Sequence, residues 1–155
     1  MFYCLANRFR CSLDHFIINA LACAALLALL SPGAHARDQG YYPVQELLVT
    51  GKTVVGEDIR YPTTGSPKIT VAVVTVVPGA SAAFHRHPVP LVAYILEGEL
   101  TVDYGAKGIK TFRAGDALVE AMDIPHRGMN HTDSMVKLLA VYIGAEGSTN
   151  VTLEK

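Results

Sequence analysis

Tryptophan is absent from this chain of 155 residues, and cysteine occurs only three times, at Cys4, Cys11 and Cys23. All three cysteines lie within the first 36 residues, which we interpret below as a leader. Without that leader the chain can form no disulfide, thiolate metal site or cysteine nucleophile. The formal net charge is −1. This balance indicates neither nucleic acid nor an anionic membrane surface as a partner.

The first 36 residues have the order of a secretory signal peptide. Arg8 and Arg10 give a basic start, residues 16–30 form a largely apolar run, and residues 34–36 are Ala-His-Ala. A helix of about fifteen residues is about 22 Å long, which is shorter than the roughly 30 Å hydrocarbon core of a bilayer. We therefore expect a signal peptide at 1–36, cleavage after Ala36, and export to the periplasm or the medium. A retained membrane anchor is the alternative.

Helical periodicity is missing after the leader, and short apolar runs separated by glycine and proline take its place. Many short strands between turn residues are typical of a sandwich or barrel. Six of the nine residues at 69–77 are valine or isoleucine, which predicts a strand covered on both faces. The expected strands of the core are 69–77, 83–87, 91–96, 99–104, 109–112, 117–120, 125–128 and 135–143.

We expect a single domain after the leader. Residues 37–68 would form an N-terminal arm with edge strands at 47–49 and 53–55, and residues 69–145 the barrel core. The tail at 146–155 would be loose or a last edge strand. Roughly 120 residues are few for one core, and edge strands can pair with another chain, so we expect a homodimer.

Four histidines follow the leader, and two of them, His85 and His87, are separated by one residue. Side chains alternate along a strand, so both imidazoles project from the same face. Such a pair offers two neutral nitrogen ligands to a metal, with two exposed loop histidines as the alternative. His126 is the third candidate ligand. His131 differs from His126 in strand parity and is not expected at the site.

The surroundings of these histidines resemble the two motifs of the cupin superfamily. The matching positions are Gly79, His85, His87 and Gly98 in the first motif, and Gly115, His126 and Asn130 in the second. The resemblance covers residues 69–143 and implies an all-β fold, the double-stranded β-helix or jelly-roll barrel. It also implies that His85, His87 and His126 hold one divalent metal ion inside the barrel. Iron, zinc, nickel, copper and manganese all remain open.

The sequence departs from these motifs in two places. Leu91 stands where the first motif has a glutamate ligand, and alternation places it on the face of His87. Ala121 and Asp123 replace the proline and glycine of the second motif, which leaves the loop before His126 unspecified. Without the glutamate, the full charge of a divalent metal stays uncompensated by its ligands. This favours an anion or hydroxide in the open position.

Two further side chains are candidates for catalysis. Glu120 precedes His126 on the strand that leads to it, and it could be a fourth ligand or a partner for an imidazole N–H. The alternative for Glu120 is a solvent-facing position. Tyr94 could contribute a hydroxyl to the cavity, or it could simply pack in the sheet.

Two classes of function fit these residues. In the first, the protein is a metal-dependent enzyme, dioxygenase-like or isomerase-like, acting on a small molecule. In the second, it is a non-catalytic cupin module that binds or senses a small ligand or a metal. Leu91 favours the second class because it removes an anionic group. A metal-free relic is a third possibility, which the matched spacing of three histidines argues against.

Overall fold

Nine strands build the fold of residues 42–155, the part of the chain that the computed structural model describes. The expected signal peptide at 1–36 lies outside the described residues. Within 42–155, no helix has the length and apolar character needed to cross a membrane. Val44–Lys155 forms one unit, and the fold below is that of this unit.

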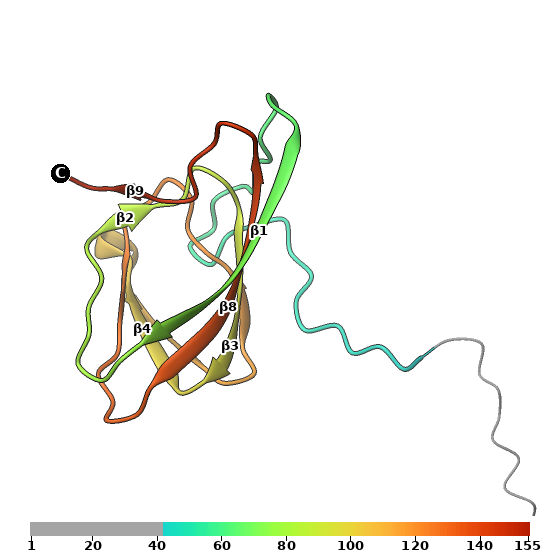
Figure 1. The fold of residues 1–155 in the computed structure, drawn as a ribbon. Helices are drawn as coiled ribbons and strands as arrows, with labels where there is room; N and C mark the ends of the chain where they lie inside the picture. The colour runs from blue at the N-terminus through green and yellow to red at the C-terminus, as the bar shows by residue number, and fades with distance from the viewer. Residues whose placement is uncertain (1–41) are drawn as a thin grey trace, which may run out of the picture. The chain divides into compact units, whose positions relative to one another are not determined.

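The strands follow one another with short connections, as Figure 1 shows. They are β1 (Pro67–Val76), β2 (His85–Arg86), β3 (Leu91–Glu97), β4 (Glu99–Asp103), β5 (Ile109–Arg113), β6 (Ala117–Val119), β7 (Arg127–Met129), β8 (Val136–Ala145) and β9 (Thr152–Leu153), with a short 3₁₀ turn, η1 (Gly105–Lys107), between β4 and β5. The expected core strands are therefore confirmed in order, with shifts at their ends. The strand at β2 is shorter than expected.

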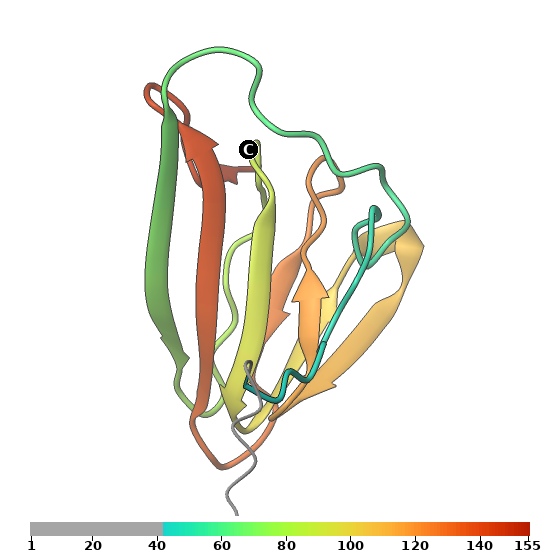
Figure 2. The same ribbon diagram turned by 90° about the vertical axis from the view of Figure 1, so that its right-hand side faces the viewer.

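Two sheets face each other across the core (Figure 2). One has the order β1-β8-β3-β6 and the other β5-β4-β7, while β2 and β9 form a small third sheet. All pairs are antiparallel. The inward side chains fill the space between the sheets, and the largest cluster includes Ile95, Leu100, Val102, Tyr104, Leu118 and Val136. The predicted all-β, double-stranded β-helix architecture is confirmed.

The turn between the two sheets requires glycine. Gly98 joins β3 to β4 with φ at +77°, a left-handed conformation that other residues rarely adopt. A Cβ atom at this position would lie 2.6 Å from the carbonyl oxygen of Met135, which is closer than any real contact. The matched glycine of the first motif thus allows the chain to cross from one sheet to the other.

The two short strands expected at 47–49 and 53–55 do not form. Between residues 44 and 66 the described chain has a single isolated bridge, from Lys52 to Asp58. Thr53 begins a turn, since its carbonyl accepts the N–H of Gly56 at 2.9 Å. One backbone bond of 2.8 Å, from the N–H of Val54 to the carbonyl of Val119, ties this segment to β6. The arm therefore packs as an irregular layer rather than extending the sheet.

The prediction that residues 69–77 are covered on both faces is wrong for the single chain. In the described unit β1 pairs with β8 alone and forms an edge of its sheet. Its outward side chains Ile69, Val71 and Val73 are 55%, 61% and 58% exposed. The alternating side chains face the core and are partly buried. The apolar outward residues on this strand have no cover within the described unit.

The tail forms a last strand and is not a loose end. β9 pairs with β2, with Leu153 opposite His85 and Thr152 opposite Arg86. The guanidinium of Arg86 also forms an ion pair with the carboxylate of Glu154. These contacts hold the tail against β2, which carries His85, and His87 follows directly after it.

Candidate metal centre

Two segments far apart in the sequence bring the candidate histidines together. His85 and His126 form an isolated antiparallel bridge in which each backbone N–H donates to the carbonyl of the other residue at 2.9 Å. Residues paired in this way project their side chains to the same side. The N–H of His87 continues the pairing by donating to the carbonyl of Met122 at 3.2 Å. The backbone itself therefore sets the three imidazoles on one face.

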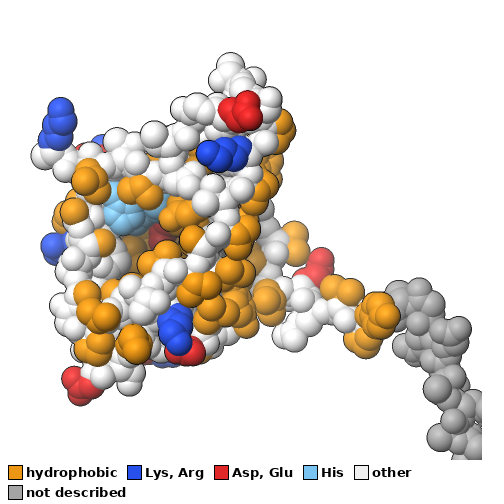
Figure 3. Space-filling view, in the orientation of Figure 1, with side chains coloured by type: hydrophobic (Ala, Val, Ile, Leu, Met, Phe, Trp, Pro, Cys, Tyr) orange, Lys and Arg blue, Asp and Glu red, His pale blue; other side chains and the backbone are white. Residues whose placement is uncertain are grey.

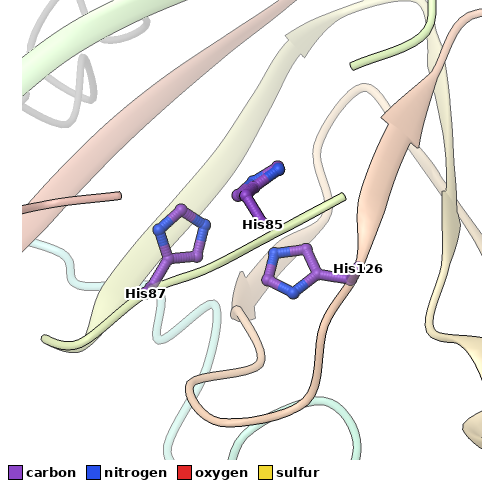
Figure 4. Close-up of side chains that lie close together, drawn as sticks. All are labelled: His85, His87 and His126. Atoms are coloured by element: carbon purple, nitrogen blue, oxygen red, sulfur yellow. The ribbon is translucent and has the colours of Figure 1, made fainter. Parts of the chain in front are cut away.

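The three rings form a nearly equilateral group (Figure 4). Their centroids lie 4.6 Å apart for His85 and His126, and 5.0 Å apart for the two pairs that include His87. One nitrogen from each ring lies within 4.8 Å of the other two. All three predicted histidines thus meet at one point, from two segments far apart in the sequence.

In each ring, the hydrogen bond of Nδ1 determines that Nε2 faces the centre of the three rings. Each Nδ1 lies 2.8–2.9 Å from a backbone carbonyl oxygen, which can only accept a hydrogen bond. The Nδ1 atoms therefore carry the hydrogen, and the Nε2 atoms keep a free lone pair. The acceptors are the carbonyls of Ala83 for His85, Asn150 for His87 and Ile124 for His126.

Burial favours the neutral form of His85 and His87 by lowering the pKa of each. His126 is 1% exposed and His87 is 3% exposed. Burial lowers the pKa of His87 from 6.5 to about 4, against the opposing effect of its bond to Asn150. The pKa of His85 is lowered as well, mainly by burial. Neutral imidazoles with free lone pairs are the form in which histidine binds metals.

The site fits a divalent metal. The Nε2 atom of His126 is fully buried and has no hydrogen-bond partner among the described residues. A buried polar atom without a partner is costly, and a metal at the centre of the three rings would satisfy it. Three imidazole ligands suit several first-row metals, so the donor set does not select one of them.

Glu120 is the carboxylate nearest to this centre. Its Oε1 atom lies 4.0 Å from the Nε2 of His126, and the residue is only 7% exposed. The solvent-facing alternative for Glu120 is therefore wrong. Since all three Nδ1 atoms donate to carbonyls, Glu120 is not the partner of an imidazole N–H. It lies on the Nε2 side of His126, where a metal would bind.

Tyr104 holds Glu120 in place, and sequence reasoning missed it. Its hydroxyl donates to Oε1 of Glu120 at 2.6 Å, and the same oxygen accepts the N–H of Ala121 at 2.8 Å. Burial and the charge of Glu120 raise the pKa of Tyr104, so the hydroxyl stays protonated as a donor. Alternation could have predicted that Tyr104 is buried, because it shares a face with Leu100 and Val102, and all three side chains are buried.

A cavity of about 160 Å³ opens beside the histidines. Figure 3 shows pale-blue histidine atoms inside a hollow ringed by hydrophobic side chains. Leu91 lines this cavity together with the three histidines and Glu120, as alternation from His85 predicted. Tyr94 does not line it. Its neighbours Ala93 and Ile95 are buried toward the core, so Tyr94 projects from the other face of β3.

His131 and Tyr142 are two further side chains that could lie near the histidines. His131 is exposed and lies outside the group of three, as expected. Tyr142 is half-buried in the cavity wall, and its ring centroid lies 5.7 Å from that of His87. Burial raises the pKa of Tyr142, so its hydroxyl is a hydrogen-bond donor at the cavity wall.

The loop before His126 is held by a carboxylate from the N-terminal arm. Oε2 of Glu57 accepts the N–H of Met122 at 2.8 Å, and Oε1 accepts those of Asp123 and Ile124 at 2.9 and 3.0 Å. This explains how the loop is ordered without the proline and glycine of the second motif. The spacing of the sequence offered no signal for the contact, because Glu57 is far from the loop along the chain.

Fold and site together define a histidine-lined β-barrel of the cupin type. Residues 72–142 match the family model described as "Cupin_2: Cupin domain". Residues 72–142 therefore form a cupin domain. No curated protein has a matching sequence.

Several solved structures are similar to the described barrel. The oxalate decarboxylase of Lactobacillus farciminis, in a formate complex, is 24% identical with a TM-score of 0.47, over 55% of this chain and 26% of that one. The DMSP lyase DddQ of Ruegeria pomeroyi is 24% identical with a TM-score of 0.48, over 55% of this chain and 42% of that one. An uncharacterised double-stranded β-helix protein of Klebsiella pneumoniae is 23% identical with a TM-score of 0.47, over 61% of this chain and 84% of that one. The chain thus spans about a quarter of the decarboxylase and less than half of the lyase.

Proposed function

We propose that this protein is a metal-dependent cupin enzyme acting on a small molecule, with one divalent metal on the Nε2 atoms of His85, His87 and His126. One observation carries the proposal. All three Nδ1 atoms donate to backbone carbonyls, and this leaves three free lone pairs directed at one point. A metal bound there supplies Lewis acidity toward a ligand in the adjoining cavity.

Glu120 is the chain's own acid–base candidate. It is the carboxylate that lines the cavity beside the histidines, and Tyr104 and Ala121 fix one of its oxygens. The other oxygen has no hydrogen-bond donor among the described residues. It can exchange a proton with a bound ligand or become a fourth metal ligand. Tyr94 has no part in this proposal because it lies on the far face of β3.

A non-catalytic binding or sensing module is the second candidate function. The observation that favours it is Leu91, which lines the cavity where the family motif has a carboxylate. A more apolar wall suits ligand capture without proton transfer. Turnover of any bound ligand distinguishes the enzyme from the module.

We also propose export and self-association. The leader at 1–36 supports export to the periplasm or the medium. The uncovered apolar face of β1 supports a homodimer, since burial of Ile69, Val71 and Val73 against a second copy removes that surface from water.

The first experiment is elemental analysis of the protein, purified without chelator or affinity histidines. We expect about one equivalent of metal, and a melting temperature that falls when chelator is added. His126→Ala should abolish both effects, and His131→Ala, an exposed histidine outside the site, should keep them. Equal melting temperatures with and without chelator, and no metal after reconstitution, would contradict the proposed metal site.

A further inference from the structure

The cavity wall narrows the class of ligand that the site can accept. We propose that the ligand is a small molecule with one polar, metal-binding head and a compact apolar body, and that it carries no second charged group. This inference rests on the proposed metal site and deepens it. It is drawn from the residues that surround the cavity, their charges and the cavity's size.

The wall is polar only on the side of the metal site. The polar lining residues are the three histidines, Glu120 and Tyr142. The remaining lining side chains are apolar, including Val74, Val76, Leu100, Val102, Leu138 and Val151. Of the residues that line the cavity in the described chain, none is lysine or arginine. A second carboxylate or a phosphate would be buried there without a counter-charge, which is costly.

The arginines nearest in sequence to the histidines are already engaged. Arg86 pairs with Glu154 and donates to the carbonyl of Asp123 at 2.6 Å. Arg127 lies 3.3 Å from the carboxylate of Asp103 and 4.7 Å from the centre of the Phe84 ring. Neither is a free cation for a second anionic group. The metal is therefore the only strong anchor for an anion in this cavity.

The cavity also limits the size of the ligand. Its volume is about 160 Å³. An apolar cavity of about 150 Å³ accepts benzene in another protein. We therefore expect the part of the ligand inside this half-open cavity to have about six to ten non-hydrogen atoms, as in a branched short-chain monocarboxylate or a simple phenol.

The test uses cobalt(II), because its visible spectrum reports both metal binding and changes in the ligands of the metal. Isovalerate and succinate are compared in titrations of the cobalt(II) protein, since both are small and succinate carries the second carboxylate. Isovalerate should change the spectrum saturably and bind at least tenfold more tightly than succinate. Ala140→Leu, which fills the cavity, should weaken isovalerate binding, and Val141→Leu, on the other face of β8, should not.

The outcomes separate this inference from the metal site itself. Failure of the protein to bind cobalt(II) contradicts the proposed function. Cobalt(II) binding combined with equal or tighter binding of succinate contradicts the ligand class alone. A cobalt(II) spectrum that responds to neither acid also overturns the inference.

A second inference rests on different contacts. We infer that Glu57 is a positioning residue for the metal site, acting through the loop at 121–124. The loop has two sides. Toward the arm, its N–H groups donate to Glu57. Toward the site, the carbonyl of Met122 accepts the N–H of His87 at 3.2 Å, and that of Ile124 accepts Nδ1–H of His126 at 2.9 Å.

A carboxylate is the group best suited to this position. Three consecutive N–H donors converge on it, and a charged acceptor strengthens such hydrogen bonds. The amide of Glu57→Gln would turn an NH₂ group toward at least one of these donors. We expect the loop carbonyls to shift and the orientations of His87 and His126 to loosen with them.

Glu57→Gln should weaken cobalt(II) binding at least tenfold and alter the cobalt(II) spectrum. Asp58→Asn is the matched control, because Asp58 is the neighbouring acid and its carboxylate pairs with Lys52 at 2.6 Å. A merely structural role would lower the melting temperature of the metal-free protein and leave the metal affinity and spectrum unchanged. That result would overturn the inference, as would a variant identical to wild type in every measurement.

Discussion

Tyr104 donates its hydroxyl hydrogen to Glu120 across 2.6 Å in a part of the molecule where both side chains are buried. The carboxylate that receives this bond is also the one that lies 4.0 Å from the Nε2 of His126. A core tyrosine and a candidate metal ligand are thus linked through one carboxylate. Substitution of Tyr104 therefore tests the contribution of this link to stability, and substitution of Glu120 tests its contribution to metal binding.

Tyr104→Phe removes one of the two donors to Oε1 of Glu120 and leaves a buried charge poorly solvated. The free energy of unfolding should fall by about 1.5–3 kcal/mol, as expected for a hydrogen bond to a charged group. Urea denaturation measures the change. Tyr94→Phe is the control, since Tyr94 lies on the outward face of β3, and its stability should stay near that of wild type.

Glu120→Gln keeps an acceptor for Tyr104 and Ala121 and removes the charge. If Glu120 binds the metal or a metal-bound water, metal affinity should fall about tenfold or more, with little change in the stability of the metal-free protein. Competition with a coloured chelator measures the affinity. Glu99→Gln, in the exposed ion pair with Arg113, is the control. An unchanged affinity would remove Glu120 from the metal site.

Stability of the metal-free protein should depend on pH through His87. Its pKa is about 4 in the fold and about 6.5 as a free side chain. Between these values the unfolded chain binds a proton that the folded chain does not, so the free energy of unfolding rises with pH. Stability should be lost as the pH falls from about 6.5 to about 4, by about 3 kcal/mol for this group. Unfolding curves of wild type and His87→Ala measure the difference, and parallel pH profiles would contradict it.

The tail should support metal binding through the carbonyl of Asn150, which accepts Nδ1–H of His87 at 2.8 Å. Removing residues 149–155 deletes this acceptor and β9, so the His87 ring is free to rotate. Metal affinity should fall about tenfold or more. Removing Lys155 alone should have no effect. Equal affinity in both truncated proteins would show that the tail does not orient His87.

The outward face of β1 should carry the proposed dimer contact. Val71→Asp places a charge in the middle of this face and should shift the protein to the monomer in light scattering. Ile109→Asp is the control, because Ile109 is 66% exposed on β5 of the other sheet. A wild-type protein that is monomeric at all concentrations would contradict the prediction.

Local spacing predicted the core strands and the pair of His85 and His87, and the resemblance to the cupin motifs added His126. Alternation identifies the shared face of His85, His87 and Leu91 without any knowledge of distant contacts. The same rule gave wrong strands at 47–49, where all three apolar side chains are exposed, and at 53–55, where Val54 and Val55 pack against the core without joining a sheet. Tyr94 was a candidate although its side chain lies on the outward face of β3, because alternation does not tell which face of a strand points inward.

The supporting contacts could not be predicted because they join segments distant in sequence. Glu57 reaches the loop before His126, and Asn150 reaches His87, through backbone atoms that carry no sequence signal. Tyr104 follows β4 and Glu120 follows β6, which are strands of different sheets, and the closed barrel brings the two side chains together. Sequence patterns thus identify the candidate metal-binding histidines, and tertiary folding determines how their rings are oriented.

The carbonyl of Asn150 also has a consequence for biosynthesis. The ribosome makes Asn150 after all three histidines, so a growing chain holds His85, His87 and His126 before it holds the group that orients His87. The proposed site therefore has all three rings oriented only after synthesis has passed Asn150. Under this proposal, the metal is selected by the ions available in the compartment where that last part of the chain folds.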